Sequence, residues 1–169
     1  FGSIKMGDAS GKTKDGEDKL GPGEIGVADY IANVRSRFTS EKDANTIIPA
    51  IEEELNKLGI TNKRVAGTNV IAQIDSGKKG KTLFLRADID ALPIQEKNDV
   101  PYKSQNDGVM HACGHDVHTA YLLGAAKLIK EHVAELSGKV IFCFQAAEEI
   151  GKGARDVIAS GALDSVDRI

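Results

Sequence analysis

Eleven residues in the second half of the chain concentrate its metal-binding chemistry. The stretch 109–119 reads Val-Met-His-Ala-Cys-Gly-His-Asp-Val-His-Thr and holds three of the four histidines, one of the two cysteines and an aspartate. A segment meant only for burial would contain aliphatic residues, whereas thiolate, imidazole and carboxylate groups are ligands of divalent transition metals. The stretch therefore predicts a metal site, with Cys113 and His115 as candidate ligands.

An amphipathic helix is predicted to begin near Thr119, directly after this stretch. Because a helix N-terminus carries partial positive charge, we expect it to favour the thiolate form of Cys113. The alternative is a buried structural thiol beside a surface histidine, as is usual for an isolated Cys-x-His. His132 lies well along the helix, and we interpret it as a polar-face or partly buried histidine rather than a ligand.

Two pairs of carboxylates follow strand-like runs. Asp88 and Asp90 follow the run 82–87, and Glu148 and Glu149 follow the run 139–145. The order strand, loop, helix, strand predicts an α/β unit with a parallel crossover, in which both carboxyl ends meet at one edge of the sheet. An arbitrary pair of glutamates is usually solvated charge. Facing a Cys/His stretch, however, one glutamate can bind metal while the other acts as general base.

The remaining strands and loops complete this α/β unit. The runs 69–75 and 82–87 predict a hairpin or two neighbouring strands, and the second is apolar enough to be covered on both faces. A surface loop is expected over 91–107. A short helix is expected over 154–160, and the residues after it lead toward a further strand. We therefore predict an α/β fold with a mostly parallel central sheet flanked by helices.

Further helices are predicted before the first strand. Apolar spacing indicates helices over 27–38 and 47–58, the second with Pro49 in its first turn and a stop at Gly59. Residues 1–26 are rich in Gly, Lys and Asp and contain few apolar residues, so we expect a flexible leader or linker there.

Composition excludes several classes of function. The formal charge is -3 and no long basic run is present, which argues against nucleic acid or an anionic membrane as the main partner. No apolar segment approaches the length of a membrane span. Cys143 lies in an apolar run and is expected to be a core thiol, so both cysteines suit a reducing cytoplasm.

Three ordered motifs resemble a known family. They are Leu-Arg-Ala-Asp-Ile-Asp-Ala-Leu-Pro at 85–93, His-Ala-Cys-Gly-His-Asp-Val-His-Thr at 111–119 and Phe-Gln-Ala-Ala-Glu-Glu at 144–149. Together they resemble the M20 metallopeptidase group, nearest to its N-acyl-amino-acid amidohydrolases, which include hippurate hydrolase and the auxin-conjugate hydrolases. The likeness covers about residues 65–169. It implies a zinc-exopeptidase-like fold that hydrolyses the amide bond of an N-acyl amino acid or peptide.

The resemblance also assigns roles to individual residues. It implies that Cys113, His115 and Glu149 bind metal, and that Glu148 activates a metal-bound water and later protonates the leaving amine. A further set either orients these ligands or binds metal itself: Asp88, Asp90, Asp116 and His118. A complete site of this kind holds two divalent ions, which can be Zn, Mn, Co or Ni.

Two departures from the family pattern bear on completeness. The family commonly carries a His-x-His-Pro-Glu run near the first helix, and 36–46 contains no such run. It also draws further ligand histidines from beyond the position of Ile169, together with an inserted lid and dimerisation domain that makes the full-length protein a homodimer. We therefore expect 27–169 to be the first half of a catalytic domain, with little activity of its own. The alternatives are a hydrolase that uses Cys113 as nucleophile and a metal-binding module without turnover.

Overall fold

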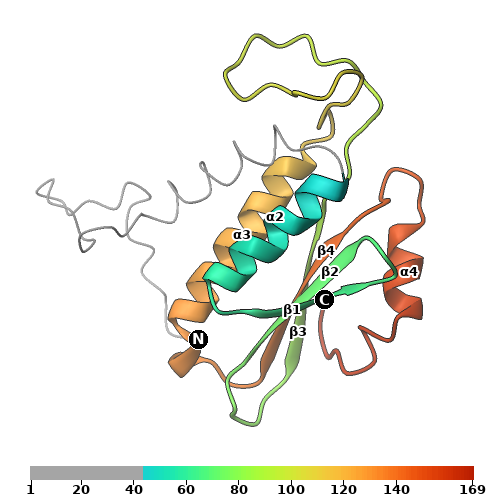
Figure 1. Ribbon diagram of the computed structural model, residues 1–169. Helices are drawn as coiled ribbons and strands as arrows, with labels where there is room; N and C mark the ends of the chain where they lie inside the picture. The colour runs from blue at the N-terminus through green and yellow to red at the C-terminus, as the bar shows by residue number, and fades with distance from the viewer. Residues whose placement is uncertain (1–43) are drawn as a thin grey trace, which may run out of the picture.

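The computed structural model describes residues 44–169, with side chains from Ile47 onward. The expectations for 1–26 and for a helix over 27–38 lie outside these residues. The elements in chain order are α2 (Ala44–Lys57), β1 (Thr61–Val65), β2 (Asn69–Asp75), β3 (Thr82–Asp88), α3 (His115–Glu131), the 3-10 helix η1 (Val133–Glu135), β4 (Lys139–Gln145) and α4 (Gly153–Ala159). Figure 1 shows these helices packed around one sheet.

The four strands form a single mixed sheet in the order β1-β2-β4-β3. β3 and β4 are parallel, whereas the β1–β2 and β2–β4 pairs are antiparallel. The α/β class with helices flanking the sheet is confirmed. Among the described strands, however, the sheet is mixed rather than mostly parallel. The tight turn at 66–68, with Gly67 at a φ of 83°, reverses the chain between β1 and β2 and so makes that pair antiparallel.

β2 and β3 are both present, but they are not neighbours. β4 lies between them and pairs Val140 with both Ile74 of β2 and Leu83 of β3. Among the described strands, β3 lies at the edge of the sheet. The prediction that the second run is covered on both faces is wrong for β3, because Leu83 is 37% exposed. β4 has that property instead, with six of its seven residues buried. The central position goes to the most apolar strand because it buries the most side chain there.

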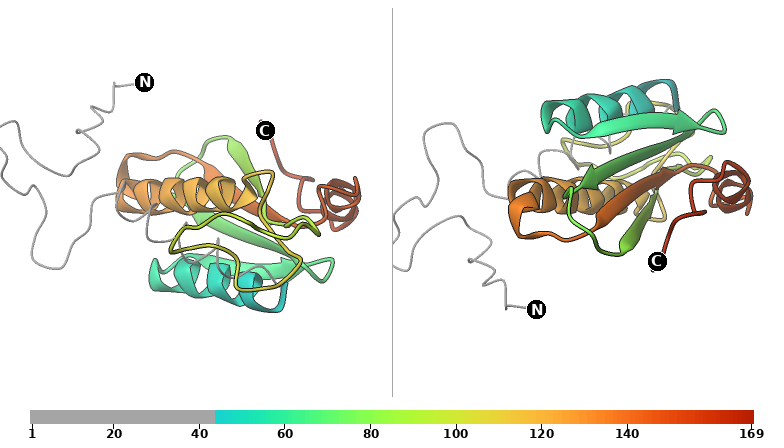
Figure 2. Two further views of the ribbon diagram at one scale, coloured as in Figure 1. Left: turned by 90° about the horizontal axis from the view of Figure 1, so that it is seen from above. Right: turned by 90° about the horizontal axis from the view of Figure 1, so that it is seen from below.

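The helices cover the two faces of the sheet unequally. Figures 1 and 2 show α2 and α3 side by side on one face and α4 on the other. β4 contributes to both cores by alternation: Phe142 and Phe144 face α2 and α3, whereas Ile141 and Cys143 pack with Val157 of α4. This arrangement fixes the carboxyl ends of β3 and β4 at one rim, next to the start of α3.

Local predictions for the helices and loops are largely confirmed. α2 ends at Lys57, and Gly59 takes up a φ of 64° after it. Pro49 lies in the second turn rather than the first, because the helix begins at Ala44. Residues 91–107 contain no helix or strand apart from the single bridge between Leu92 and Met110. None of the helices in the described part of the chain has the length and apolar character needed to cross a membrane.

The end of the chain pairs with β3 at one position. Arg168 forms an isolated parallel bridge with Leu83, and the backbone N–H of Phe84 donates to the Arg168 carbonyl at 2.8 Å. The further strand expected after the short helix is therefore represented by this one bridge.

Candidate metal site

α3 begins at His115, four residues earlier than predicted. His115, Asp116 and His118 therefore lie in its first turn rather than in a loop, and Gly114 precedes them at a φ of 83°. The apolar stripe of the helix starts only at Tyr121, so the periodic signal could not reveal a first turn made of polar residues. One helical turn consequently holds two imidazoles at the rim of the sheet.

His115 is buried and has a distinct environment at each ring nitrogen. Nδ1 donates a hydrogen bond to the Asp90 carbonyl at 2.9 Å and lies 3.3 Å from Asp90 Oδ1. With the hydrogen on Nδ1, the lone pair on Nε2 is available. This tautomer can bind a metal ion through Nε2. This tautomer is assigned from the hydrogen-bond partners.

Carboxylate oxygens surround the available Nε2 atom of His115. It lies 3.7 Å from Asp88 Oδ1, 3.8 Å from Glu149 Oε1 and 4.0 Å from Glu148 Oε2. None of these oxygens can donate a hydrogen bond to an imidazole lone pair while the carboxylates are ionised. A cation bound at Nε2 would therefore be balanced by the negative charge around it, so the residues present fit a divalent metal ion.

Two groups of potential ligands meet at this nitrogen. One consists of Cys113, His115 and Glu149, and the other of Asp88, His115 and His118. Within each group the ligand atoms lie within 4.8 Å of one another. The first matches the predicted ligand set, and the second adds two of the residues expected to orient or bind metal.

The other predicted site residues lie outside both groups. Glu148 is adjacent to the first group, and its side chain is 41% exposed. Asp90 contacts His115 at Nδ1 rather than at Nε2. Asp116 is buried in the first turn of α3. Glu148 and Asp90 therefore lie next to His115 but belong to neither group of potential ligands.

The turn after β4 aims Glu148 and Glu149 at His115. Ala147 has a φ of 58°, an uncommon conformation for a residue with a side chain, and its carbonyl accepts hydrogen bonds from Lys152 and Gly153. The backbone N–H of Glu149 donates to Asp90 Oδ2 at 3.1 Å. Asp90 therefore ties the ends of β3 and β4 together, which explains how two carboxylates from different strands converge.

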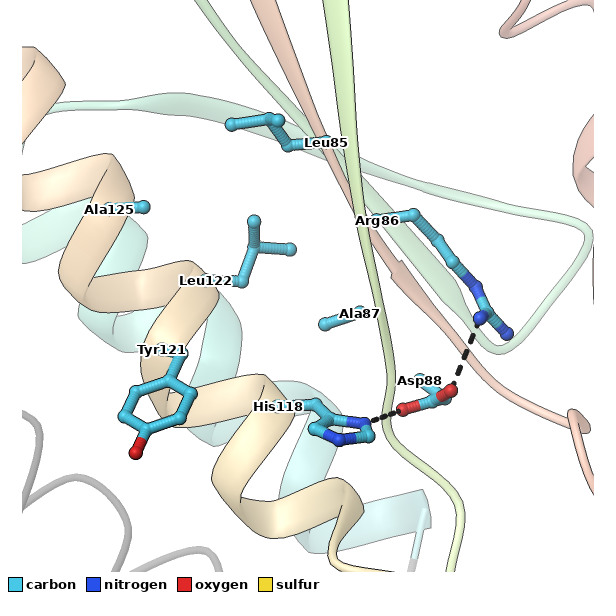
Figure 3. A pocket seen from close by; sticks show the side chains of 8 residues that line it. All are labelled: Leu85, Arg86, Ala87, Asp88, His118, Tyr121, Leu122 and Ala125. Atoms are coloured by element: carbon cyan, nitrogen blue, oxygen red, sulfur yellow. Dashed lines mark hydrogen bonds and ion pairs between the residues drawn. The ribbon is translucent and has the colours of Figure 1, made fainter. Parts of the chain in front are cut away.

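Asp88, the last residue of β3, is held from two sides. Arg86 Nη1 lies 3.2 Å from Asp88 Oδ2, and His118 Nδ1 donates to Asp88 Oδ1 at 2.5 Å, as Figure 3 shows. Burial alone would raise the pKa of Asp88, but the hydrogen bond from His118 and the charges of His115, Arg86 and His118 outweigh it and lower the pKa.

Arg86 was not predicted as part of the site. Its Nε atom also donates to Gln145 Oε1 at 3.0 Å, so it bridges the ends of β3 and β4. The sequence signal was the spacing of Arg86 and Asp88, because residues two apart in a strand point to the same face. A hollow of about 520 Å³ between β3 and α3 opens beside Asp88 and is lined by Leu85 and Tyr121 on its apolar side.

The two cysteines differ in burial. Cys143 has the environment that was predicted for it, whereas the protonation state predicted for Cys113 is not supported. Cys143 is buried, and burial raises its pKa to about 12, which confirms a core thiol. Cys113 is exposed, and a hydrogen bond with Glu149, followed by burial and by the charges of Glu149, Glu148 and Asp88, raises its pKa. The expectation that the helix N-terminus favours the thiolate of Cys113 is therefore wrong in the absence of a cation. The nearby carboxylates disfavour a further negative charge. A bound cation would reverse that balance.

His132 lies away from the site, as predicted. It follows the last residue of α3, and its exposed ring interacts with Glu135 Oε1 at 3.0 Å through Nδ1.

Comparison with known proteins identifies the family. The model of peptidase family M20/M25/M40 matches residues 84–169, just over half of the chain. The chain therefore belongs to this family of hydrolases, and the predicted resemblance is confirmed. The matched region contains all three motifs in full and every residue predicted for the site.

Individual relatives support the same placement. The chain is 51% identical to an N-acetyl-L-cysteine deacetylase of Bacillus subtilis over 70% of its length, and 42% identical to an N-acyl-L-amino acid amidohydrolase of Geobacillus stearothermophilus over 77%. These matches cover 29% and 35% of the relatives. A crystal structure of a dinuclear metal-binding M20 peptidase from Bacillus subtilis superposes with a TM-score of 0.76 at 40% identity, over 83% of this chain and 41% of that one. The chain thus spans less than half the length of each.

Proposed function

We propose that this chain carries the metal ligands and the general base of a hydrolase that cleaves the amide bond of N-acyl amino acids. The observation that carries the proposal is His115, whose Nε2 lone pair faces Cys113 and Glu149 in one ligand group with Glu148 beside it. When bound, a divalent cation supplies Lewis-acid chemistry: it lowers the pKa of a water and polarises the amide carbonyl.

The side chains have three further roles: metal binding, positioning of the ligands and proton transfer. Cys113, His115 and Glu149 hold the ion, while Asp90 fixes the tautomer of His115 and the backbone of Glu149. Glu148 lies outside both ligand groups, so its carboxylate is free to take a proton from water at Oε2 and return it to the leaving nitrogen. Glu148 Oε2 lies 4.0 Å from His115 Nε2, so a water bound beside that nitrogen would be within reach of this oxygen.

The relatives support this substrate class. One is named for N-acetyl-L-cysteine, one for N-acyl-L-amino acids and one, from Arabidopsis thaliana, for IAA-amino acid conjugates. The dinuclear relative supports two ions in a complete site, held with ligands additional to those described here. We further propose that the full-length protein is a homodimer and acts in the cytoplasm, where Cys113 stays reduced.

Glutamine substitutions in the full-length gene product test the proposal. Glu148→Gln keeps the shape of the side chain but cannot accept a proton, so it should retain metal and lose at least about 100-fold in kcat. Glu149→Gln should instead weaken metal binding. Metal content by mass spectrometry and hydrolysis of N-acetyl amino acids measure the two effects, and reversed phenotypes would show that the roles are exchanged.

A chelator separates the proposal from its alternatives. Removal of metal should abolish hydrolysis here, whereas a cysteine-nucleophile hydrolase would keep its activity. The raised pKa of Cys113 also argues against a nucleophilic role, because the thiolate is the reactive form. Metal binding without any turnover in the full-length protein would instead establish a binding module.

A further inference from the structure

The two ligand groups of the metal site compete for one atom. Both include His115, and the nitrogen that is free to ligate in both is Nε2, because Nδ1 donates to the Asp90 carbonyl. A nitrogen lone pair binds one ion at a time. A cation at His115 is therefore completed either by Cys113 and Glu149 or by Asp88 and His118.

The two sets differ in what a cation must displace. Both oxygens of Asp88 already have cationic or N–H partners, Arg86 at Oδ2 and His118 at Oδ1, and the His118 Nδ1 atom is occupied by the same contact. In the other set, Cys113 is hydrogen-bonded to Glu149. In each set a cation displaces one hydrogen bond to a carboxylate, from the thiol of Cys113 or from His118, but at Asp88 it must also approach the guanidinium of Arg86.

Arg86 is itself held in place. Its Nε atom donates to the side-chain oxygen of Gln145, a residue that is only 3% exposed, and its Nη1 atom faces Asp88. Figure 3 shows the guanidinium extended along β3 toward the carboxylate. The planar fork of an arginine is preorganised to meet both partners at once, whereas a lysine presents a single flexible ammonium group.

We propose that Arg86 is a positioning residue that keeps Asp88 out of metal coordination and so directs the cation to Cys113, His115 and Glu149. It contacts neither the predicted ligands of that group nor the general base, and it acts through Asp88. The inference rests on the proposed function, since it concerns which residues hold the metal.

Titration of the 169-residue chain with Co²⁺ tests this without any assay of activity. Thiolate bound to Co²⁺ gives a charge-transfer absorption band in the near ultraviolet that carboxylate and imidazole ligands do not give. In the unmodified chain we expect this band, and Cys113→Ala should lower Co²⁺ affinity by about tenfold or more. In Arg86→Ala the band should weaken, and adding Cys113→Ala to it should lower affinity by less than about threefold, because Asp88 and His118 take over.

Variants at Asp88 make the test specific. Asp88→Ala alone should leave the band and the Co²⁺ affinity within about twofold of the unmodified chain, because Asp88 is not a ligand while Arg86 holds it. The double variant Arg86→Ala with Asp88→Ala should recover the full band. Arg86→Lys keeps the charge but loses one of the two contacts, and should give an intermediate band. Circular dichroism checks that each variant folds.

The outcomes separate the two proposals. An unmodified chain that binds Co²⁺ without the thiolate band, or does not bind it, would overturn the proposed ligand set and this inference with it. The role of Arg86 alone would be overturned if the unmodified chain shows the band but Cys113→Ala lowers the Co²⁺ affinity equally in the presence and absence of Arg86. Should Arg86→Ala not fold, loss of the band in Asp88→Ala would do the same.

Discussion

At the scale of single residues, the candidate site contains contacts that hold the predicted ligands in place. Asp90 is the clearest case, because its carbonyl accepts from His115 while its carboxylate accepts from the backbone of Glu149. Substituting the side chain leaves the first contact and removes the second. The position of Glu149 therefore depends on the Asp90 carboxylate more than the position of His115 does.

We expect Asp90→Ala to lower the affinity for Zn²⁺ by about 10-fold, at the lower end of the effects seen when groups behind a ligand are removed. Isothermal titration calorimetry measures the affinity. Asp99→Ala, in the exposed part of the loop over 91–107, serves as the matched control and should change nothing. Equal affinities in the two variants would show that Glu149 does not depend on Asp90.

The two cysteines should react very differently with iodoacetamide in the folded chain. Cys113 is exposed, so it should be alkylated, slowly at neutral pH and faster at alkaline pH because its raised pKa keeps it a thiol. Cys143 is buried with a pKa of about 12 and should react only after unfolding. Mass spectrometry of the peptides identifies the modified residue. Zn²⁺ should protect Cys113, and an unprotected Cys113 would contradict its role as a ligand.

At the scale of helices and strands, the connection between α2 and β1 includes a two-point ion pair. Arg64 donates to both carboxylate oxygens of Glu52, at 2.7 and 2.6 Å. The hydrogen bond from Arg64 lowers the pKa of Glu52 below its ordinary value of 4.5, although burial opposes it. The lowered pKa means that this contact stabilises the folded chain above pH 4.5, and that the contribution is lost as the pH falls through the folded-state pKa.

Glu52→Gln should therefore lower Tm slightly at pH 7 and not at pH 3. The effect should be small and should shrink in 1 M NaCl, because the pair is exposed and screened. Thermal denaturation followed by circular dichroism at both pH values measures it. Asp99→Asn, in the exposed part of the loop over 91–107, is the control for the loss of one surface charge. A pH-independent effect would point to lost packing instead.

The start of α4 allows no side chain. A Cβ atom on Gly153 would lie 1.7 Å from the Ala146 carbonyl oxygen, in the turn that carries Glu148 and Glu149. We expect Gly153→Ala to destabilise the chain by about 3 kcal/mol. Gly151→Ala, where a positive φ meets open space, should cost about 1–2 kcal/mol. Urea denaturation compares the two, and an equal cost would mean that the backbone at Gly153 adjusts freely.

Sequence patterns predicted the elements better than their arrangement. β4 was bounded correctly because its apolar run is continuous and local. The position of β4 between β2 and β3 was missed because strand order depends on burial in the assembled sheet. β1 was missed altogether, since four of its five residues, Thr-Asn-Lys-Arg-Val, are polar and none is buried. The convergence of Asp88 and Glu149 on His115 was predicted from the strand ends, whereas the Arg86 contact was missed, although its two-residue spacing from Asp88 in β3 was a signal for it.

At the scale of the whole molecule, the described residues provide one complete ligand group at a time, because His115 is shared. We expect the 169-residue chain to bind one Zn²⁺ or Mn²⁺ tightly, in contrast to the dinuclear relative. Inductively coupled plasma mass spectrometry after gel filtration measures the ratio. His115→Ala should abolish binding, and His132→Ala, remote from the site, should not. Two tightly held ions per chain would show that further ligands lie within these residues.

The strand order has a consequence for the growing polypeptide on the ribosome. β1 and β2 are adjacent in the chain and can pair as soon as both have emerged, whereas β3 must wait for β4 and Arg168, the partners seen for it in the described residues. At typical rates of translation the wait lasts several seconds. Glu149 is made later than Cys113 and His115, and also later than Asp88 and His118, so the group with Cys113 is the second of the two ligand groups to be completed. Under the proposed ligand set, secure capture of the ion is a late event that waits for the synthesis of β4 and the turn after it.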